Sequence, residues 1–191
     1  MDEEQLVQGL RNQEPGAVQE LVVSHGDHLF RSACLLCGDQ AEAQDLVQET
    51  LLQAVRSAPR FRGHSRLYTW LHGILLNLTR HYHRDRKRMV YDEKLAHRET
   101  ASVEANLSGL DGETTAGALA EALQRLSGPH REVLILRFYE ELKIQEIAAH
   151  LGISNGTVKS RLHYAIAEMQ RLLLPELNLF SVGGTQEKAK R

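Results

Sequence analysis

Residues 143–173 read KIQEIAAHLGISNGTVKSRLHYAIAEMQRLL, and apolar residues recur at helical spacing in both halves of this stretch. Gly152 separates the halves, where a tight turn favours a residue that tolerates positive φ. Ser154 is a candidate N-cap, because its hydroxyl can accept a hydrogen bond from the next helix's first turn. The spacing predicts a helix-turn-helix, with an ordinary helical hairpin as the alternative. Its expected inner face consists of Ile147, Ala148, Leu151, Val158, Leu162, Ala165, Ile166 and Met169.

The second helix of this pair carries a polar, basic and hydroxylic surface along its N-terminal half. The outward residues are Thr157, Lys159, Ser160, His163 and Tyr164, with Arg161 at the flank. Lysine and arginine side chains can bond guanine or phosphate, and hydroxyl groups can bond either. We therefore expect this surface to act as a recognition helix in a DNA major groove.

The remaining sequence predicts further helices and no strands, because long alternations of β-branched residues are absent. Asp39 is a plausible N-cap, and Pro59 ends the helix that follows it. In the first part of the chain we expect a pair of helices within 4–24, the second of which begins at Pro15-Gly16, and further helices at 26–37, about 40–57 and about 66–88. In the second part, one helix is expected to begin near residue 117, and another follows it before the helix-turn-helix. In those last two, the expected inward residues are Leu119, Ala122, Leu123, Leu126, Val133, Leu134, Leu136 and Phe138.

Residues 89–116 lose the helical period and are rich in Glu, Ser, Gly, Thr and Ala, which is typical of a flexible linker, with a transient helix at most. The expected fold is therefore all-α, with two small helical domains joined by this linker. The predicted organisation is a first domain at 1–88, a linker at 89–116, a second domain at 117–176 and a tail at 177–191.

The composition places the chain among soluble globular proteins. It has 191 residues, of which 42% are apolar and 25% charged, and no apolar run approaches the roughly 18–20 residues of a membrane helix. The acidic start MDEEQLVQGL resembles neither a secretory signal nor an Arg-rich transit peptide. Two cysteines cannot form a disulfide scaffold. We expect a cytoplasmic protein with no direct membrane insertion.

The formal net charge of −2 conceals blocks of opposite charge. Residues 1–55 hold ten acids and two bases, whereas residues 56–91 hold nine bases and one acid. Affinity for nucleic acid depends on local neutralisation of phosphates, not on net charge. The basic block is therefore the expected site for a polyanion, with a solvated basic helix end as the alternative.

His25, His28, Cys34 and Cys37 form a separate cluster in the sequence. Four such ligands could hold zinc, and the Cys34-x-x-Cys37 pair could be redox-active. A continuous helix from 28 to 37, however, would separate the two pairs by about 9 Å, too far for one tetrahedral ion. We favour core packing, because free cysteine behaves as a small hydrophobic residue, so no metal or cofactor is expected. Metal binding and redox sensing remain open alternatives.

Two motifs in the same order resemble a known family. AEAQDLVQETLLQA (41–54) and FRGHSRLYTWLHGILLNLTRHYHR (61–84) are similar to region 2 of the bacterial extracytoplasmic-function (ECF) sigma factors, small members of the sigma-70 family. LSGPHREVLILRFYEELKIQEIA (126–148), followed by GTVKSRL (156–162), is similar to their region 4. The resemblance covers roughly residues 4–88 and 117–174, and it implies an RNA polymerase specificity subunit.

The resemblance also implies a role for particular residues. Docking to the β′ clamp helices of core RNA polymerase would use Asp45, Leu46, Gln48 and Glu49. Contacts to the unwound −10 element would come from Arg60, Phe61, Arg62, Gly63, His64, Ser65, Asn77, His81 and Arg84, with the loop capturing a flipped base. Contacts to the −35 duplex would come from Arg137, Thr157, Lys159, Ser160, Arg161, His163 and Tyr164. Trp70 is expected in the core, on the face of Leu67, Ile74 and Leu78.

The implied partners are core polymerase, including its β flap, promoter DNA and an anti-sigma factor. A DNA-binding regulator of the LuxR type is an alternative, since its helix-turn-helix is similar, but it leaves the 61–84 motif unexplained. A thiol or zinc enzyme is a third reading. No Ser/His/Asp order, phosphate loop or carboxylate pair supports a catalytic site, so we expect no enzyme activity and no cofactor.

Overall fold

The structure is a computed structural model that describes the backbone of residues 2–96 and 114–182 and the side chains of 2–84 and 117–173. The chain divides into two compact units, Met1–Asn106 and Leu107–Arg191, which are described separately. Within the described ranges every regular element is helical, which confirms the predicted all-α fold. None of the helices in these ranges has the length and apolar character needed to cross a membrane.

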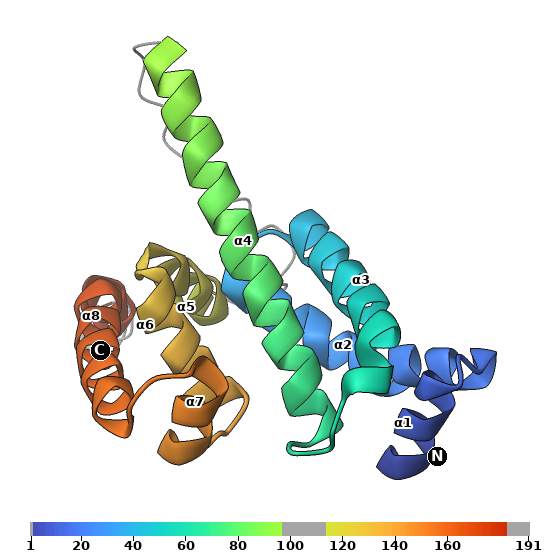
Figure 1. The fold of residues 1–191 in the computed structure, drawn as a ribbon. Coiled ribbons are helices and arrows are strands. Elements are labelled where there is room, and N and C mark those ends of the chain that lie inside the picture. The colour runs from blue at the N-terminus through green and yellow to red at the C-terminus, as the bar shows by residue number, and fades with distance from the viewer. Residues whose placement is uncertain (1, 97–113, 183–191) are drawn as a thin grey trace, which may run out of the picture. The chain divides into compact units, whose positions relative to one another are not determined.

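The first unit packs three long helices together and one short helix beside them (Figure 1). Its elements are α1 (Glu3–Arg11), α2 (Pro15–Cys37), α3 (Gln40–Ser57), the 3-10 turn η1 (Ala58–Arg60) and α4 (Leu67–Ala96). The core is mainly leucine, and the side chains of Leu21, Leu29, Leu67, Leu71 and Leu75 are fully buried. Among them Ser32 and His72 form a buried hydrogen bond of 2.9 Å that joins α2 to α4.

Local signals explain where these helices begin and end. Asp2 and Gln5 form a capping box at the start of α1, and the Asp39 carboxylate accepts a hydrogen bond of 3.0 Å from the Glu42 N–H, which confirms the predicted cap of α3. Gly38 ends α2 with φ of 80°, a conformation that glycine adopts without strain. The expected break before residue 26 is wrong, since α2 continues through Gly26. Leu21 and Leu29 are buried on either side of it, and this packing offsets the about 1 kcal/mol cost of a mid-helix glycine.

The second unit consists of α5 (Thr114–Arg125), α6 (Gly128–Leu134), the π-helical turn η2 (Ile135–Tyr139), α7 (Ile144–Leu151) and α8 (Asn155–Val182). Gly152 has φ of 66° in the turn between α7 and α8, and the Ser154 Oγ accepts a hydrogen bond of 3.1 Å from the Thr157 N–H. Both predicted turn signals of the helix-turn-helix are therefore confirmed. Val133, Leu136 and Val158 lie at the centre of the apolar core.

Three residues expected inside the second unit are exposed, namely Leu119 (46%), Phe138 (63%) and Ile166 (38%). Phe138 lies in η2, where the Glu140 N–H bonds the Ile135 carbonyl five residues back, so the wider turn shifts the helical register and turns Phe138 outward. Leu119 lies in the middle of α5, and Ile166 lies at the edge of the inner face of α8.

The expected segment boundaries also differ from the helices of the structure. Helix α4 continues to Ala96, into the segment 89–116 that was predicted as a linker, because MVYDEKLA contains good helix-forming residues even without an apolar face. Helix α5 begins at Thr114 and α8 continues to Val182, into the predicted tail. The rest of the predicted linker (97–113) and tail (183–191) lies outside the described residues.

Candidate nucleic-acid interface

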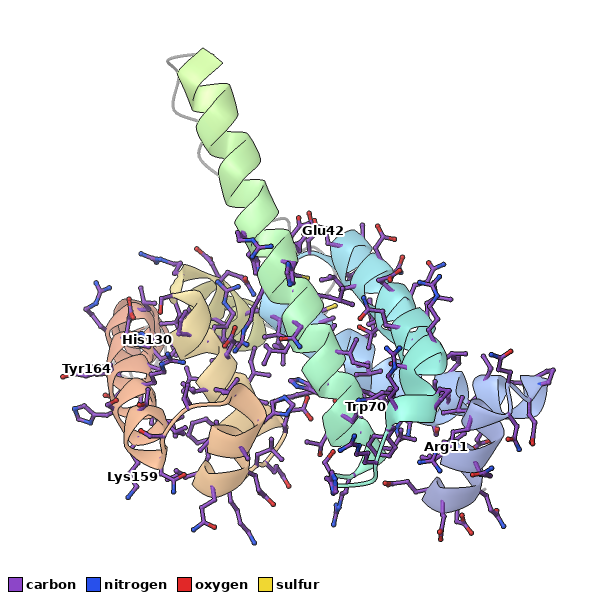
Figure 2. The ribbon with its side chains drawn as sticks, in the orientation of Figure 1. Arg11, Glu42, Trp70, His130, Lys159 and Tyr164 are labelled. Atoms are coloured by element: carbon purple, nitrogen blue, oxygen red, sulfur yellow. The ribbon has the colours of Figure 1, made fainter. Side chains whose placement is uncertain are left out.

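The outer face of α8 is polar and exposed over its N-terminal half. Its inner face is held by Val158, Leu162 and Ala165, which are buried. On the opposite side Lys159, Ser160, His163 and Tyr164 are exposed, and Figure 2 shows Lys159 and Tyr164 projecting away from the helix pair. Thr157 and Arg161 are half-buried at the edges of this face. A helix that presents one cation and several hydrogen-bonding groups on one face can enter a major groove.

Three hydroxyl groups form hydrogen bonds at the start of α8. The Ser154 and Thr157 hydroxyls lie 2.9 Å apart, and the Ser160 hydroxyl donates a hydrogen bond of 3.0 Å to the Thr157 carbonyl. The first turn, whose N–H groups have no partners within the helix, is therefore locally capped. The positive end of the helix dipole at this turn favours an approaching phosphate.

Arg137 lies apart from α8 in the sequence. It is exposed on η2, and its Nη1 donates a hydrogen bond of 3.2 Å to the carbonyl of Leu142, just before α7 begins. Phe138 beside it is exposed as well. The sequence offered no sign of this exposed aromatic ring, because a π-helical turn cannot be read from an apolar period of 3.6 residues.

In the first unit the loop that precedes α4 is exposed except at Phe61. Arg60, Arg62, Gly63, His64 and Ser65 are all exposed, and Gly63 has φ of 70°. Phe61 is only 7% exposed, and its ring lies 4.8 Å from that of Trp70 between centroids. Trp70 is half-buried by this contact and does not lie open to a base, in line with its expected packing role. Phe61 therefore anchors the loop instead of lying on its outer surface.

Helix α1 contacts both ends of the same loop. The Arg11 Nη2 donates a hydrogen bond of 2.6 Å to the Phe61 carbonyl, and the Glu3 Oε1 accepts one of 2.8 Å from the Leu67 N–H. Figure 2 labels Arg11 on α1 and Trp70 near the start of α4. The sequence reading missed both contacts, because each joins residues at least 50 positions apart.

Further along α4, the predicted −10 residues lie on one exposed stripe. Asn77, His81 and Arg84 occupy positions i, i+4 and i+7, and all three are exposed. The Arg84 Nη2 lies 2.7 Å from the His81 Nδ1, so these two side chains form one polar group. At 1.5 Å per residue, Asn77 lies about 15 Å along the helix from Leu67. The loop and the stripe could thus contact different nucleotides of one strand.

The outer face of α3 contains a further set of exposed polar residues. Asp45 and Gln48 are exposed, and Glu49 is half-buried with its carboxylate 3.9 Å from Arg56. Leu46 is 8% exposed and faces the core beside Val47, and its contact with core polymerase stays a prediction. Leu52 is instead the apolar residue on the outer face, with 42% exposure. It lies four residues beyond Gln48, so the helical period alone could have found it.

The cysteines lie in a packed environment. Cys37 is buried, its Sγ donates a hydrogen bond of 3.2 Å to the Asp39 carbonyl, and burial raises the pKa of its thiol to about 11. Burial, followed by the charge of Asp39, also raises the pKa of Cys34. Since the thiolate is the reactive and metal-binding form, these environments favour the packing interpretation.

The two histidines of that cluster face an aromatic ring. His28 stacks on Tyr68 with ring centroids 4.4 Å apart, and the His25 ring lies 5.9 Å from the same tyrosine. Burial is the main cause that lowers the pKa of His25. Within the described residues, no group of three or more His, Cys, Asp or Glu side chains is placed to hold a metal ion.

One helical unit contains a helix-turn-helix with an exposed polar face, and the other contains an exposed basic loop and polar stripe. Residues 21–89 match the family model of Sigma-70 region 2, and residues 122–171 match that of Sigma-70, region 4. The ECF RNA polymerase sigma factor SigL of Mycobacterium tuberculosis is 34% identical over 184 residues, which cover 91% of this chain and 97% of SigL. The ECF RNA polymerase sigma factor EcfG of Rhodopseudomonas palustris is 36% identical over 144 residues, covering 74% and 76% of the two chains.

Solved structures agree with these relatives. The sigma factor RpoE of Bartonella quintana, in complex with the anti-sigma factor NepR, has a TM-score of 0.66 and 32% identity and covers 81% of this chain and 94% of its own. CnrH in complex with the cytosolic domain of CnrY has a TM-score of 0.65 at 24% identity, over 90% and 96% of the chains, a likeness of fold alone. The chain belongs to the ECF sigma factors of the sigma-70 family. It is an RNA polymerase sigma factor.

Proposed function

We propose that three surfaces of the chain have separate roles in promoter-specific transcription initiation. The outer face of α3 docks the β′ clamp helices of core polymerase, the loop at 60–65 with the stripe on α4 reads the −10 strand, and α8 reads the −35 duplex. The observation that carries this proposal is the separation of an exposed recognition face in one unit from an exposed basic loop and stripe in the other. The two domains would have separate roles. Residues 1–88 would dock to core polymerase and read the −10 strand, and residues 117–176 would read the −35 duplex and contact the β flap of the polymerase.

The exposure of the candidate residues refines this assignment. In the loop, the side chains exposed to a flipped base are those of Arg60, Arg62, His64 and Ser65, while Phe61 packs beneath them against Trp70. On α3, Asp45, Gln48 and Glu49 offer a polar acidic surface suited to a basic groove. Leu46 supports this surface from the core side, and the exposed Leu52 offers an additional apolar contact. On α8, Lys159 is the one exposed cation within the predicted contact set.

Regulation by an anti-sigma factor is part of the proposal. The Bartonella quintana relative is bound to such a protein, and this chain matches 94% of that relative's length. We place the chain in the cytoplasm with the polymerase and assign it no catalytic residue of its own. Closed and open arrangements of the two units would require a linker, and the predicted linker lies mostly outside the described residues.

In-vitro transcription with purified bacterial core polymerase tests the proposed function. The template is a supercoiled library with a randomised upstream region, and sequencing of transcript 5′ ends identifies the promoters used. We expect core polymerase with this chain to start at sites that share two sequence elements, at the −35 and −10 positions. Identical start sites with and without the chain would contradict the proposal. Tight binding of the chain to duplex, together with no effect on the transcription start sites of core polymerase, would favour the LuxR-type alternative.

Two single substitutions are expected to separate DNA binding from polymerase docking. Lys159→Ala should weaken binding to the selected −35 duplex about tenfold, because one base or phosphate contact contributes about 1–3 kcal/mol. Asp45→Ala should weaken binding to core polymerase and leave −35 binding unchanged. Fluorescence anisotropy with duplex and with core polymerase measures both affinities. Arg171→Ala on α8 and Asp27→Ala on α2 remove matched exposed charges elsewhere and should change neither affinity.

A further inference from the structure

Helix α1 bonds the backbone at both ends of the loop that precedes α4. At the first end, the Arg11 guanidinium bonds the Phe61 carbonyl at 2.6 Å, a charge-assisted contact. At the other end, the Glu3 carboxylate accepts from the N–H of Leu67, the first residue of α4, at 2.8 Å. Such an N–H has no partner within its helix, and a carboxylate there also interacts favourably with the helix dipole. The two contacts come from opposite ends of α1, about 12 Å apart along its axis.

Helix α1 is itself held firmly on the first unit. Leu6 and Leu10 are 4% and 1% exposed, and the capping box at Asp2 secures its first turn. A Cβ added at Gly9 would lie 2.7 Å from the Ala17 Cβ, so the backbones of α1 and α2 approach each other closely at this point. The Glu14 N–H donates a hydrogen bond of 2.9 Å to the Gly9 carbonyl beside that contact. The helix can therefore act as a rigid support.

The residues between the two held ends have little support of their own. Arg62, Gly63, His64, Ser65 and Arg66 are all exposed. A reading site must hold its groups to within a fraction of an ångström, and a loop does so only when its ends are fixed. Helix α1 lies outside the region 2 match, which begins at residue 21.

We propose that α1 is a brace for the base-reading loop, with Arg11 and Glu3 as positioning residues that hold its two ends. Neither side chain contacts DNA in this account; each acts through the backbone of the loop. The base preference of the loop then depends on a helix about 50 residues away in the sequence. This inference rests on the proposed role of the loop in reading the −10 strand.

A selection on single-stranded DNA tests the brace. Holoenzyme assembled from core polymerase and the full chain is incubated with an oligonucleotide pool that carries a randomised block, and the bound fraction is sequenced. Glu3→Ala is compared with Glu4→Ala, its neighbour with the same charge on the same exposed turn. Arg11→Ala is compared with Arg31→Ala, which removes an exposed cation from α2. His64→Ala identifies the positions that the loop itself reads.

The wild-type holoenzyme should enrich particular bases, and His64→Ala should reduce enrichment at the positions read by the loop. At those positions Glu3→Ala and Arg11→Ala should reduce enrichment about fivefold or more, while Glu4→Ala and Arg31→Ala match the wild type. Glu3→Gln, which keeps an oxygen acceptor for the Leu67 N–H, should restore enrichment. A merely structural role would lower the amount of bound DNA without changing the pattern of enriched bases.

Each remaining outcome contradicts a specific statement. If His64→Ala alters the pattern and Glu3→Ala and Arg11→Ala do not, the loop reads bases without the brace, and the inference is wrong while the proposed function stands. If these two variants lose yield equally at all positions, α1 only stabilises the fold. If His64→Ala leaves the pattern unchanged, the proposed reading role of the loop fails, and the brace fails with it.

Discussion

Arg131→Met is expected to lower the free energy of unfolding of the second unit by about 3 kcal/mol or more. The Arg131 side chain is buried, with 8% exposure, and its guanidinium donates to three main-chain carbonyls around the C-terminal end of α5. The distances are 2.9 Å to Leu123, 2.8 Å to Gln124 and 3.2 Å to Leu126. Methionine fills similar space but leaves these carbonyls without the donor.

A loss of this size is large for so small a unit, because small domains bury limited apolar surface and are marginally stable. Hydrogen exchange of the full chain, followed by mass spectrometry, reports on the two units separately. Peptides from 117–173 should lose protection in the variant, while peptides from 2–84 keep theirs. Arg125→Met removes an exposed arginine from the last turn of α5 and should cost no more than about 0.5 kcal/mol. Equal protection in both variants would show that the buried guanidinium is dispensable.

Gly9→Ala is expected to destabilise the first unit by about 2 kcal/mol, although alanine normally favours a helix over glycine. The added Cβ would lie 2.7 Å from the Ala17 Cβ and 3.2 Å from the Glu14 carboxylate. Ala17 is fully buried on α2, so relief requires a shift of the α1 backbone. Urea unfolding of the full chain, monitored by Trp70 fluorescence in the first unit, measures the loss.

Gly16→Ala provides the matched control for this substitution. Gly16 lies in the first turn of α2, and a Cβ there meets no atom within 4 Å. The variant should be as stable as the wild type or more stable by up to about 1 kcal/mol. If Gly9→Ala also left the free energy of unfolding unchanged, the close approach of α1 to α2 would not contribute to the stability of the first unit. In the oligonucleotide selection, Gly9→Ala should reduce base enrichment at the same positions as Glu3→Ala. The reason is that it displaces α1, whose side chains form both hydrogen bonds to the loop.

The helix-turn-helix could be predicted from local residues because each of its signals acts over a few positions. The left-handed turn at Gly152, the Ser154 cap and the apolar period of α8 all depend on neighbours within about one helical turn. The Asp39 cap of α3 could be predicted for the same reason. The helical period also predicts that Leu46 lies on the buried face of α3, and Leu52 lies on the exposed face.

Residue types and short-range spacing therefore establish the helices, their caps, the two-part organisation and the faces on which the candidate DNA contacts lie. Tertiary packing alone determines that Phe61 turns inward onto Trp70, that η2 turns Phe138 outward, and that α1 holds both ends of the loop. The bonds of Arg11 and Glu3 span 50 and 64 residues, and no helical period or capping rule extends that far. These hydrogen bonds depend on the packing of the core leucines, which brings distant helices together. Burial of apolar surface determines where the helices lie, and the polar groups then bond across the contacts that result.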